Sequence, residues 1–229
     1  MTLTKLKLLA VTGVGCVALL GAAYLVPTTP AAPAAAPDPS AGAGNANAPV
    51  DRVEYVGVGG SDTKYPTQIE SKVGDKQVKL ALTGAALRKK VIVNVYTVAS
   101  YAEEGVALNS ADDLAGKDCV KQLHLVMATN VSGKQMADAF TDAIRQNYPK
   151  PAFDTEVATL NQKLRAMDLA KGDQVWITNV PGKGLQIDVV GKVSVAIDTP
   201  AFSKAMWDVY LGKRNIGEPI KAGLVSRLK

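Results

Sequence analysis

Cysteine, histidine and aromatic side chains are scarce in this sequence, and their scarcity excludes several classes of function. The 229 residues include 2 cysteines and 1 histidine, and aromatic residues make up only 5%. Two cysteines cannot build a disulfide-stabilised scaffold. A single histidine, His124, excludes most zinc sites made of cysteine and histidine, and it leaves only one base for a catalytic triad. We therefore expect no metal and no cofactor.

Long runs of one charge are absent as well. The chain has 26 Lys+Arg and 21 Asp+Glu, a formal net charge of +5, and these residues are scattered singly along it. Binding of nucleic acid requires clustered lysine and arginine on one face or helix. We therefore expect no nucleic-acid partner.

The amino-terminal segment, residues 1–26, has the pattern of a membrane anchor. Lys5 and Lys7 precede an uncharged, mostly apolar run from Leu8 to Val26. At a rise of about 1.5 Å per residue this run spans roughly 29 Å, close to the hydrocarbon thickness of a bilayer. Lysines hold their end in the cytoplasm, so we expect the rest of the chain on the periplasmic side of the cell inner membrane. A cleaved signal peptide, which would release a secreted domain, is the alternative.

Residues 27–50 form a linker rich in alanine and proline. They hold six of the 12 prolines and a single charge, Asp38. Such a segment cannot bury enough apolar surface to fold and is typical of an extended tether. The folded part is therefore predicted to be one domain, residues 51–229, in which Cys119 is the remaining thiol and belongs to an apolar strand pattern.

Hydrophobic periodicity predicts an α+β fold for this domain. Alternation with period two predicts strands over residues 78–82, 91–101, 123–127, 175–180, 185–189 and 193–197. Apolar stripes with helical spacing predict helices over residues 132–149, 154–167, 199–212 and 219–228. The order of these elements is not the strict alternation of a doubly wound sheet. It favours a largely antiparallel sheet packed against a layer of helices.

Several motifs in this order resemble a known family. Leu82-Thr-Gly-Ala-Ala-Leu-Arg88-Lys-Lys precedes the strand that ends at Tyr101, and a Pro181-Gly-Lys-Gly184 turn follows later. The last long helix carries Phe202-x-x-x-Met206-Trp207-Asp208-x-Tyr210-Leu211-Gly212. From about Tyr65 to Leu228 their spacing resembles the exported bacterial branch of the chalcone isomerase-like family. The resemblance implies a broad antiparallel sheet, a helical layer and an apolar cleft between the two.

The resemblance also implies candidate ligand-binding residues. In plant enzymes of this family, an arginine and a tyrosine hold the substrate oxygens while a flavanone ring closes. In a fatty-acid-binding branch, the same arginine and a tyrosine hold a carboxylate. The arginine corresponds to Arg88 here, and a strand hydroxyl corresponds to Tyr96 or the adjacent Thr97. From the sequence pattern alone, Arg88 also fits a solvated basic turn, and Tyr96 also fits a core position.

Other family positions depart from the enzymes. The tyrosine of the enzymes corresponds to Met136, their asparagine corresponds to Ala143, and a late threonine or serine falls close to Thr199. These departures argue against flavanone cyclisation. The candidate ligand-binding residues are Arg88, Tyr96, Thr97, Met136 and Thr199.

Three functions remain open at this point. The first is non-catalytic binding of a small apolar ligand, a fatty acid or similar carboxylate, with its head group at Arg88. The second is an intramolecular lyase or isomerase acting on a small apolar carbonyl compound, with Arg88 stabilising an oxyanion. The third is a structural or interaction module of the cell envelope, in which side chains fill the cleft and leave no void beside Arg88.

Overall fold

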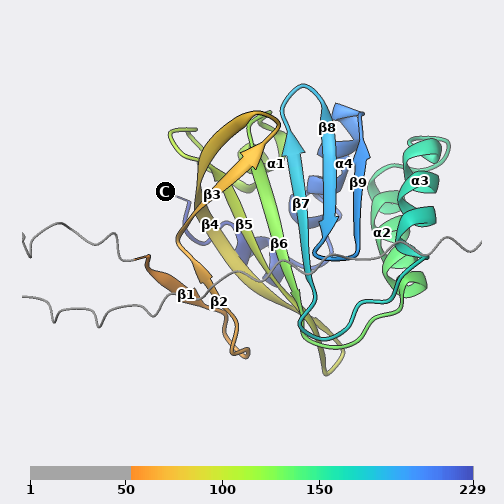
Figure 1. Ribbon diagram of the computed structural model, residues 1–229, viewed down its shortest axis with the longest axis horizontal. Helices are drawn as coiled ribbons and strands as arrows, with labels where there is room; N and C mark the ends of the chain where they lie inside the picture. Colours follow the sequence, from red (N-terminus) through yellow and green to blue (C-terminus); the bar gives the residue numbers. More distant parts are fainter. Residues whose placement is uncertain (1–52, 229) are drawn as a thin grey trace, which may run out of the picture. The chain divides into compact units, whose positions relative to one another are not determined.

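The computed structural model describes residues 53–228, in which a curled β-sheet carries helices on one face (Figure 1). The predicted membrane anchor or signal peptide and the alanine- and proline-rich linker lie outside the described residues. Within the described part of the chain, no helix is both long enough and apolar enough to cross a bilayer.

The sheet has seven strands in the order in which they occur along the chain, and each pairs antiparallel with the next. They are β3 (Gln68–Val73), β4 (Lys76–Lys90), β5 (Val93–Glu103), β6 (Lys121–Met127), β7 (Gln174–Val180), β8 (Gly184–Val189) and β9 (Val193–Ile197). A separate two-stranded sheet pairs β1 (Tyr55–Gly57) with β2 (Lys64–Pro66). The predicted α+β fold with a largely antiparallel sheet is confirmed.

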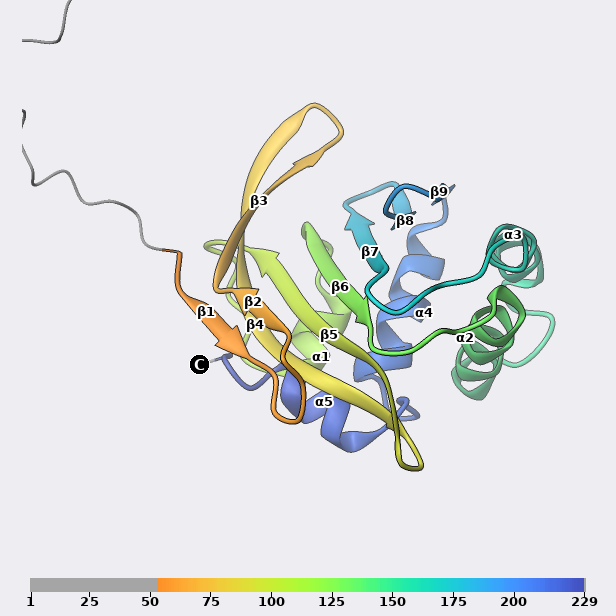
Figure 2. The same ribbon diagram turned by 60° about the horizontal axis from the view of Figure 1, so that its bottom comes forward.

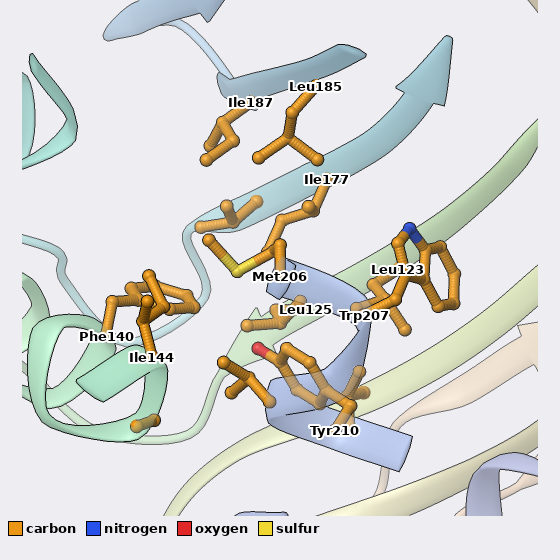
Figure 3. Packing of buried hydrophobic residues seen from close by; sticks show 14 of the residues in the cluster. Leu123, Leu125, Phe140, Ile144, Ile177, Leu185, Ile187, Met206, Trp207 and Tyr210 are labelled. Carbon is orange, nitrogen blue, oxygen red and sulfur yellow. The ribbon is translucent and has the colours of Figure 1, made fainter. Parts of the chain in front are cut away.

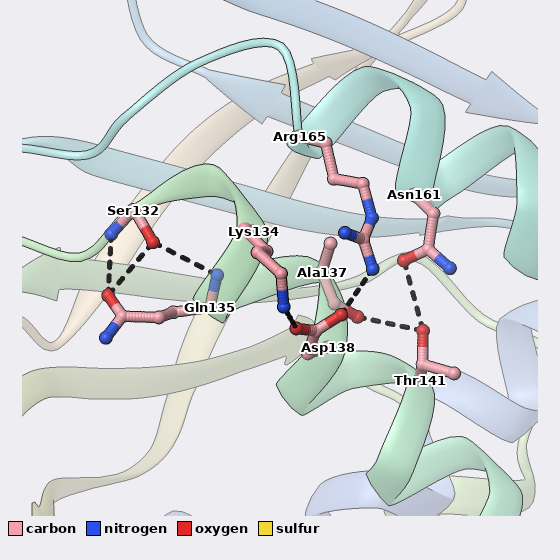
Figure 4. A network of polar contacts seen from close by, with 8 residues as sticks. All are labelled: Ser132, Lys134, Gln135, Ala137, Asp138, Thr141, Asn161 and Arg165. Carbon is pink, nitrogen blue, oxygen red and sulfur yellow. Dashed lines mark hydrogen bonds and ion pairs between the residues drawn. The ribbon is translucent and has the colours of Figure 1, made fainter.

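Five helices accompany the sheet: α1 (Ala111–Gly116), α2 (Gly133–Asn147), α3 (Asp154–Leu164), α4 (Pro200–Leu211) and α5 (Glu218–Leu224). The start of α2 is fixed by a reciprocal capping arrangement, in which the Ser132 hydroxyl accepts from the Gln135 amide and the Gln135 side chain accepts from the Ser132 amide (Figure 4). Asp138 of α2 forms ion pairs with Lys134 and with Arg165 at the end of α3, so α2 and α3 are held side by side.

The main core lies between the sheet and the helices (Figure 3). Strand β6 turns Leu123, Leu125 and Met127 toward the helices, as the alternation of its sequence predicts. From α4, Met206, Trp207 and Tyr210 fill the same layer. Helix α4 therefore packs on the face of the sheet that carries Leu123, Leu125 and Met127.

The sheet is strongly curled, and a second, smaller core lies on its other face. The Gln122 side chain on β6 donates to the Ser71 hydroxyl on β3 at 2.9 Å, although β4 and β5 separate these strands in the sheet. Strands three places apart in a flat sheet would be about 14 Å apart. The curl encloses a cluster that includes Tyr65, Leu80 and Tyr101.

The predicted boundaries of the first two strands were wrong. Strand β4 continues to Lys90, well past the predicted end at residue 82, and the chain turns at Val91 and Ile92, where a strand was predicted to begin. The small residues after Leu82 have low β-propensity, yet they allow α5 to approach. A Cβ on Gly84 would lie 2.1 Å from the Gly223 carbonyl oxygen, and the Thr83 hydroxyl donates to the Leu224 carbonyl at 2.9 Å.

Candidate ligand-binding cavity

A cavity of about 450 Å³ lies where the end of the β4–β5 pair meets α2 and α4. Small-molecule sites have volumes of about 300–1,000 Å³, so this space suits a compact ligand. Its wall is mainly apolar, and the apolar lining residues include Val95, Met136, Phe140, Ala143, Val209 and Ile216. The void beside Arg88, which the structural-module hypothesis predicted to be filled, is therefore present.

One side of the cavity carries a cation and two phenols. Arg88 on β4 and Tyr96 on β5 are direct partners across the antiparallel pair, so their side chains share a face of the sheet. Tyr210 reaches the same space from α4, and Figure 3 shows its hydroxyl on the side that faces α2. The sheet register and one helix thus bring the three polar groups together.

The phenols are neutral hydrogen-bond donors. Burial raises the pKa of Tyr96, and the Tyr210 hydroxyl and the Arg88 charge oppose that rise. Burial, together with Tyr96, holds the pKa of Tyr210 well above its ordinary value, and Arg88 again opposes the rise. At physiological pH both hydroxyls stay protonated, and the hydroxyl that is not donating to its neighbour can donate a hydrogen bond to an anion.

Arg88 retains most of its donor capacity. Its Nη1 donates to the Lys89 carbonyl at 3.3 Å, and Arg88 takes part in none of the ion pairs among residues 53–228. A guanidinium has five N–H donors in a planar fork that matches a carboxylate. The cavity therefore presents a cation whose charge is not neutralised by a carboxylate of the described chain.

The lining contains no group suited to accept a proton at neutral pH. Its other polar members are Lys90, Thr129, Asn130 and Gln135, and no aspartate, glutamate, histidine or cysteine of residues 53–228 lines it. A general base works best with a pKa near the operating pH, which a buried phenol with a raised pKa does not have. The arrangement can hold an anion and an apolar body.

The structure brings together three of the five predicted site residues and separates two. Arg88, Tyr96 and Met136 all line the cavity. Thr97 lies outside the lining, and its hydroxyl is hydrogen-bonded to the Tyr65 hydroxyl at 2.8 Å in the second core. Because successive residues of a strand point to opposite faces, Tyr96 and Thr97 cannot both reach the same cavity.

Thr199 is also placed elsewhere. It precedes α4, and its hydroxyl donates to a Glu156 carboxylate oxygen on α3 at 3.0 Å. It does not line the cavity. This hydrogen bond links the start of α4 to α3. Thr199 therefore lies apart from the cluster around Arg88.

Sequence reasoning missed Tyr210. The residue lies in the family motif, four positions after Met206, and therefore extends the buried stripe of α4 by one turn. A tyrosine at the end of an apolar stripe commonly has a buried ring and a hydroxyl that needs a polar partner. That signal was present in the sequence, but only the fold places the hydroxyl next to Tyr96.

His124 lies on the far face of the sheet. It stacks on Trp176 with ring centroids 3.7 Å apart and shares a hydrogen bond of 2.9 Å with Gln174. Burial lowers its pKa to about 4 against the opposing effect of Gln174. It is therefore neutral at physiological pH and remote from the cavity.

Comparison with known proteins gives the family and the fold. The sequence profile of the chalcone isomerase-like family matches residues 61–226. The fold is similar to that of a crystal structure of an Arabidopsis thaliana fatty-acid binding protein, with a TM-score of 0.56 and 16% identity. That match covers 76% of this chain and 96% of the plant chain, and at such identity it supports the fold alone. No curated protein matches the sequence. Since the family match spans most of the sequence, the chain belongs to the chalcone isomerase-like family.

Proposed function

We propose that the domain binds a fatty acid or a similar apolar carboxylate and does not transform it. The observation that supports this proposal is the Arg88 guanidinium, which forms no ion pair within residues 53–228, beside the Tyr96 and Tyr210 hydroxyls at one side of an apolar cavity. The carboxylate would accept from the guanidinium and one of the phenols, and the tail would lie against Met136 and Phe140 of α2. The plant structure of similar fold is that of a fatty-acid binding protein, which agrees with this ligand class.

The cavity chemistry supports binding over catalysis. Ring closure or isomerisation requires a group that takes up a proton and later returns it. Met136 and Ala143, which stand at two polar positions of the family's enzymes, contribute only apolar surface to the lining. The remaining phenols are donors with raised pKa values. The proposal therefore assigns Arg88 to ligand recognition.

The test is to compare an acid with the alcohol of the same chain length. Calorimetric titrations with decanoate and decanol should show that Arg88→Ala weakens decanoate binding by about 30-fold, the equivalent of about 2 kcal/mol for charge-assisted hydrogen bonds. Decanol has no charge for Arg88 to hold, so its affinity should change little. Arg88 is partly exposed, so the fold should tolerate its removal.

The matched control is Lys72→Ala, which removes a cation from the exposed face of β3, away from the cavity lining. It should leave the affinities of both ligands unchanged. Equal losses for acid and alcohol in Arg88→Ala would refute the carboxylate role. Conversion of a carbonyl ligand by the parent protein would favour the isomerase hypothesis.

We propose in addition that residues 1–26 anchor the chain in the inner membrane or direct its secretion as a cleaved signal. The support is the sequence alone, two lysines followed by the apolar run from Leu8 to Val26. Protease added to spheroplasts that express the chain should digest the domain. A domain protected until the membrane is broken would contradict the proposal.

A further inference from the structure

The tip of the β4–β5 hairpin is apolar and almost fully exposed. Val91 and Ile92 form its two-residue loop, and their exposed fractions are 92% and 90%. The next residue, Val93, is 49% exposed. Figure 2 shows this hairpin reaching beyond the rest of the sheet. Two consecutive aliphatic side chains thus lie almost wholly in water, where they gain little from packing, and a third is half exposed.

Backbone conformation does not account for a valine at this position either. Val91 has φ = 57°, in the left-handed region. Two-residue hairpin loops that need a positive φ normally use glycine, asparagine or aspartate there. A β-branched residue in this region is an outlier. A residue that departs from the conformational preference of its type, and makes no packing contact that compensates, is expected to have another role.

Three cations lie next to the apolar tip on its β4 side. Arg88, Lys89 and Lys90 directly precede it, and Lys89 and Lys90 are exposed. The sequence contains no aspartate or glutamate from Leu80 to Ala102. The turn between β1 and β2 braces the hairpin, because the Asn94 side chain donates to the Gly60 carbonyl at 3.3 Å. The β4 side of the tip therefore carries Arg88, Lys89 and Lys90, which we call the cationic collar, and the bracing turn between β1 and β2 contributes one carboxylate, Asp62.

The hairpin is continuous with the ligand cavity. Lys90, Val93 and Val95 belong to the cavity lining together with Arg88. Whatever surface covers Val91 and Ile92 therefore lies next to Lys90 and Val93, which are exposed residues of the cavity lining.

We propose that the β4–β5 hairpin docks on an anionic phospholipid bilayer. Val91 and Ile92 enter the boundary of the acyl chains, and Lys89 and Lys90 contact the phosphates of the head groups. Apolar residues next to lysines are the combination by which peripheral proteins bind anionic lipid surfaces. Among surfaces that would cover the tip, an anionic bilayer complements both its aliphatic residues and its cationic collar. The cavity then opens next to the membrane.

The experiment places a tryptophan at the tip of the full chain. Ile92→Trp and the control Val190→Trp, an exposed position at the β8–β9 turn, are each reconstituted in vesicles with and without phosphatidylglycerol. Brominated acyl chains quench tryptophan that enters the bilayer. With anionic vesicles that contain brominated chains, most of the fluorescence that Ile92→Trp adds to that of the parent should be quenched. The fluorescence that Val190→Trp adds should persist.

Charge reversal tests the collar. In the Ile92→Trp background, Lys89→Glu with Lys90→Glu should abolish the quenching. Lys72→Glu with Lys76→Glu, which makes the same charge change on the exposed β3–β4 hairpin, should leave the quenching in place.

Three results would overturn the proposal. These are an unquenched tryptophan in Ile92→Trp with anionic vesicles, equal quenching in Val190→Trp, and a blue shift in Ile92→Trp that grows with protein concentration in the absence of lipid. The last result would identify a contact between two copies. No fatty acid is added in this experiment, and the quenching is read at the hairpin tip, so its outcome can be distinguished from that of the fatty-acid proposal.

Discussion

Arg88 and Tyr96 owe their pairing to strand register. They are direct partners across β4 and β5, and the register shifts at the next position, between Arg88 and Lys89. Thr97, one residue on, faces the second core and bonds to Tyr65. The resemblance supplied the residue types, but only the register decides which hydroxyl shares the face of the guanidinium. This is why Arg88 and Tyr96 line the same cavity and Thr97 does not.

His124 should make stability depend on pH. Burial holds its folded-state pKa at about 4, below the ordinary value of 6.5. The unfolded chain therefore binds a proton more readily between these values, so the stability from this group is complete above about pH 6.5 and is lost as pH falls toward 4. Allowing for solvent screening of a partly exposed ring, the loss should be about 1–2 kcal/mol.

Urea unfolding near neutral pH and near the lower end of this window measures that loss. His124→Phe keeps an aromatic ring against Trp176 and removes the titrating group. The variant should show a smaller drop in its unfolding midpoint than the parent. An equal drop in both proteins would mean that other groups cause the pH dependence.

Among the elements, long periodic segments were predicted well and short polar ones were not. The helices around Phe140, Leu160 and Met206 are confirmed, because each buries an apolar stripe with helical spacing. Strands β1, β2 and β3 and helix α1 were missed, because they are short or lack a strong apolar pattern. The β4–β5 turn was missed because its two loop residues are valine and isoleucine, which favour strands.

That turn makes a prediction at the scale of the element. Val91→Asn places at φ = 57° a residue that tolerates the left-handed region. The free energy of unfolding should therefore rise by about 1 kcal/mol. Thermal unfolding should show a midpoint higher by about 3 °C for a chain of this size.

Ile92→Asn is the control for this substitution. Among residues 53–228, positive φ outside glycine occurs only at Val91 and Phe153, so Ile92 offers no backbone strain to relieve. Its substitution should leave the midpoint unchanged. If Val91→Asn lowers the midpoint, or if both variants raise it equally, the positive φ of Val91 does not destabilise the fold.

At the scale of the whole molecule, the curl of the sheet was beyond sequence reasoning. Alternation along β6 gives two faces but not the curvature that brings Ser71 within reach of Gln122. The helical layer was predicted, yet its exact seating depends on close backbone approaches such as that between Gly84 and Gly223. The cavity is the space left where α2 and α4 meet the end of the β4–β5 pair. Tyr210 lines this space because of how α4 is seated, which the sequence does not show.

The central claim is that this cavity holds an apolar carboxylate with its head group at Arg88, and native mass spectrometry tests it most directly. Protein purified without added lipid, alongside Arg88→Ala, would be examined for bound small molecules. The account predicts a fatty acid on the parent that is absent from the variant. A parent that carries none and takes up none when it is offered, or a variant that retains the same acid equally well, would contradict it.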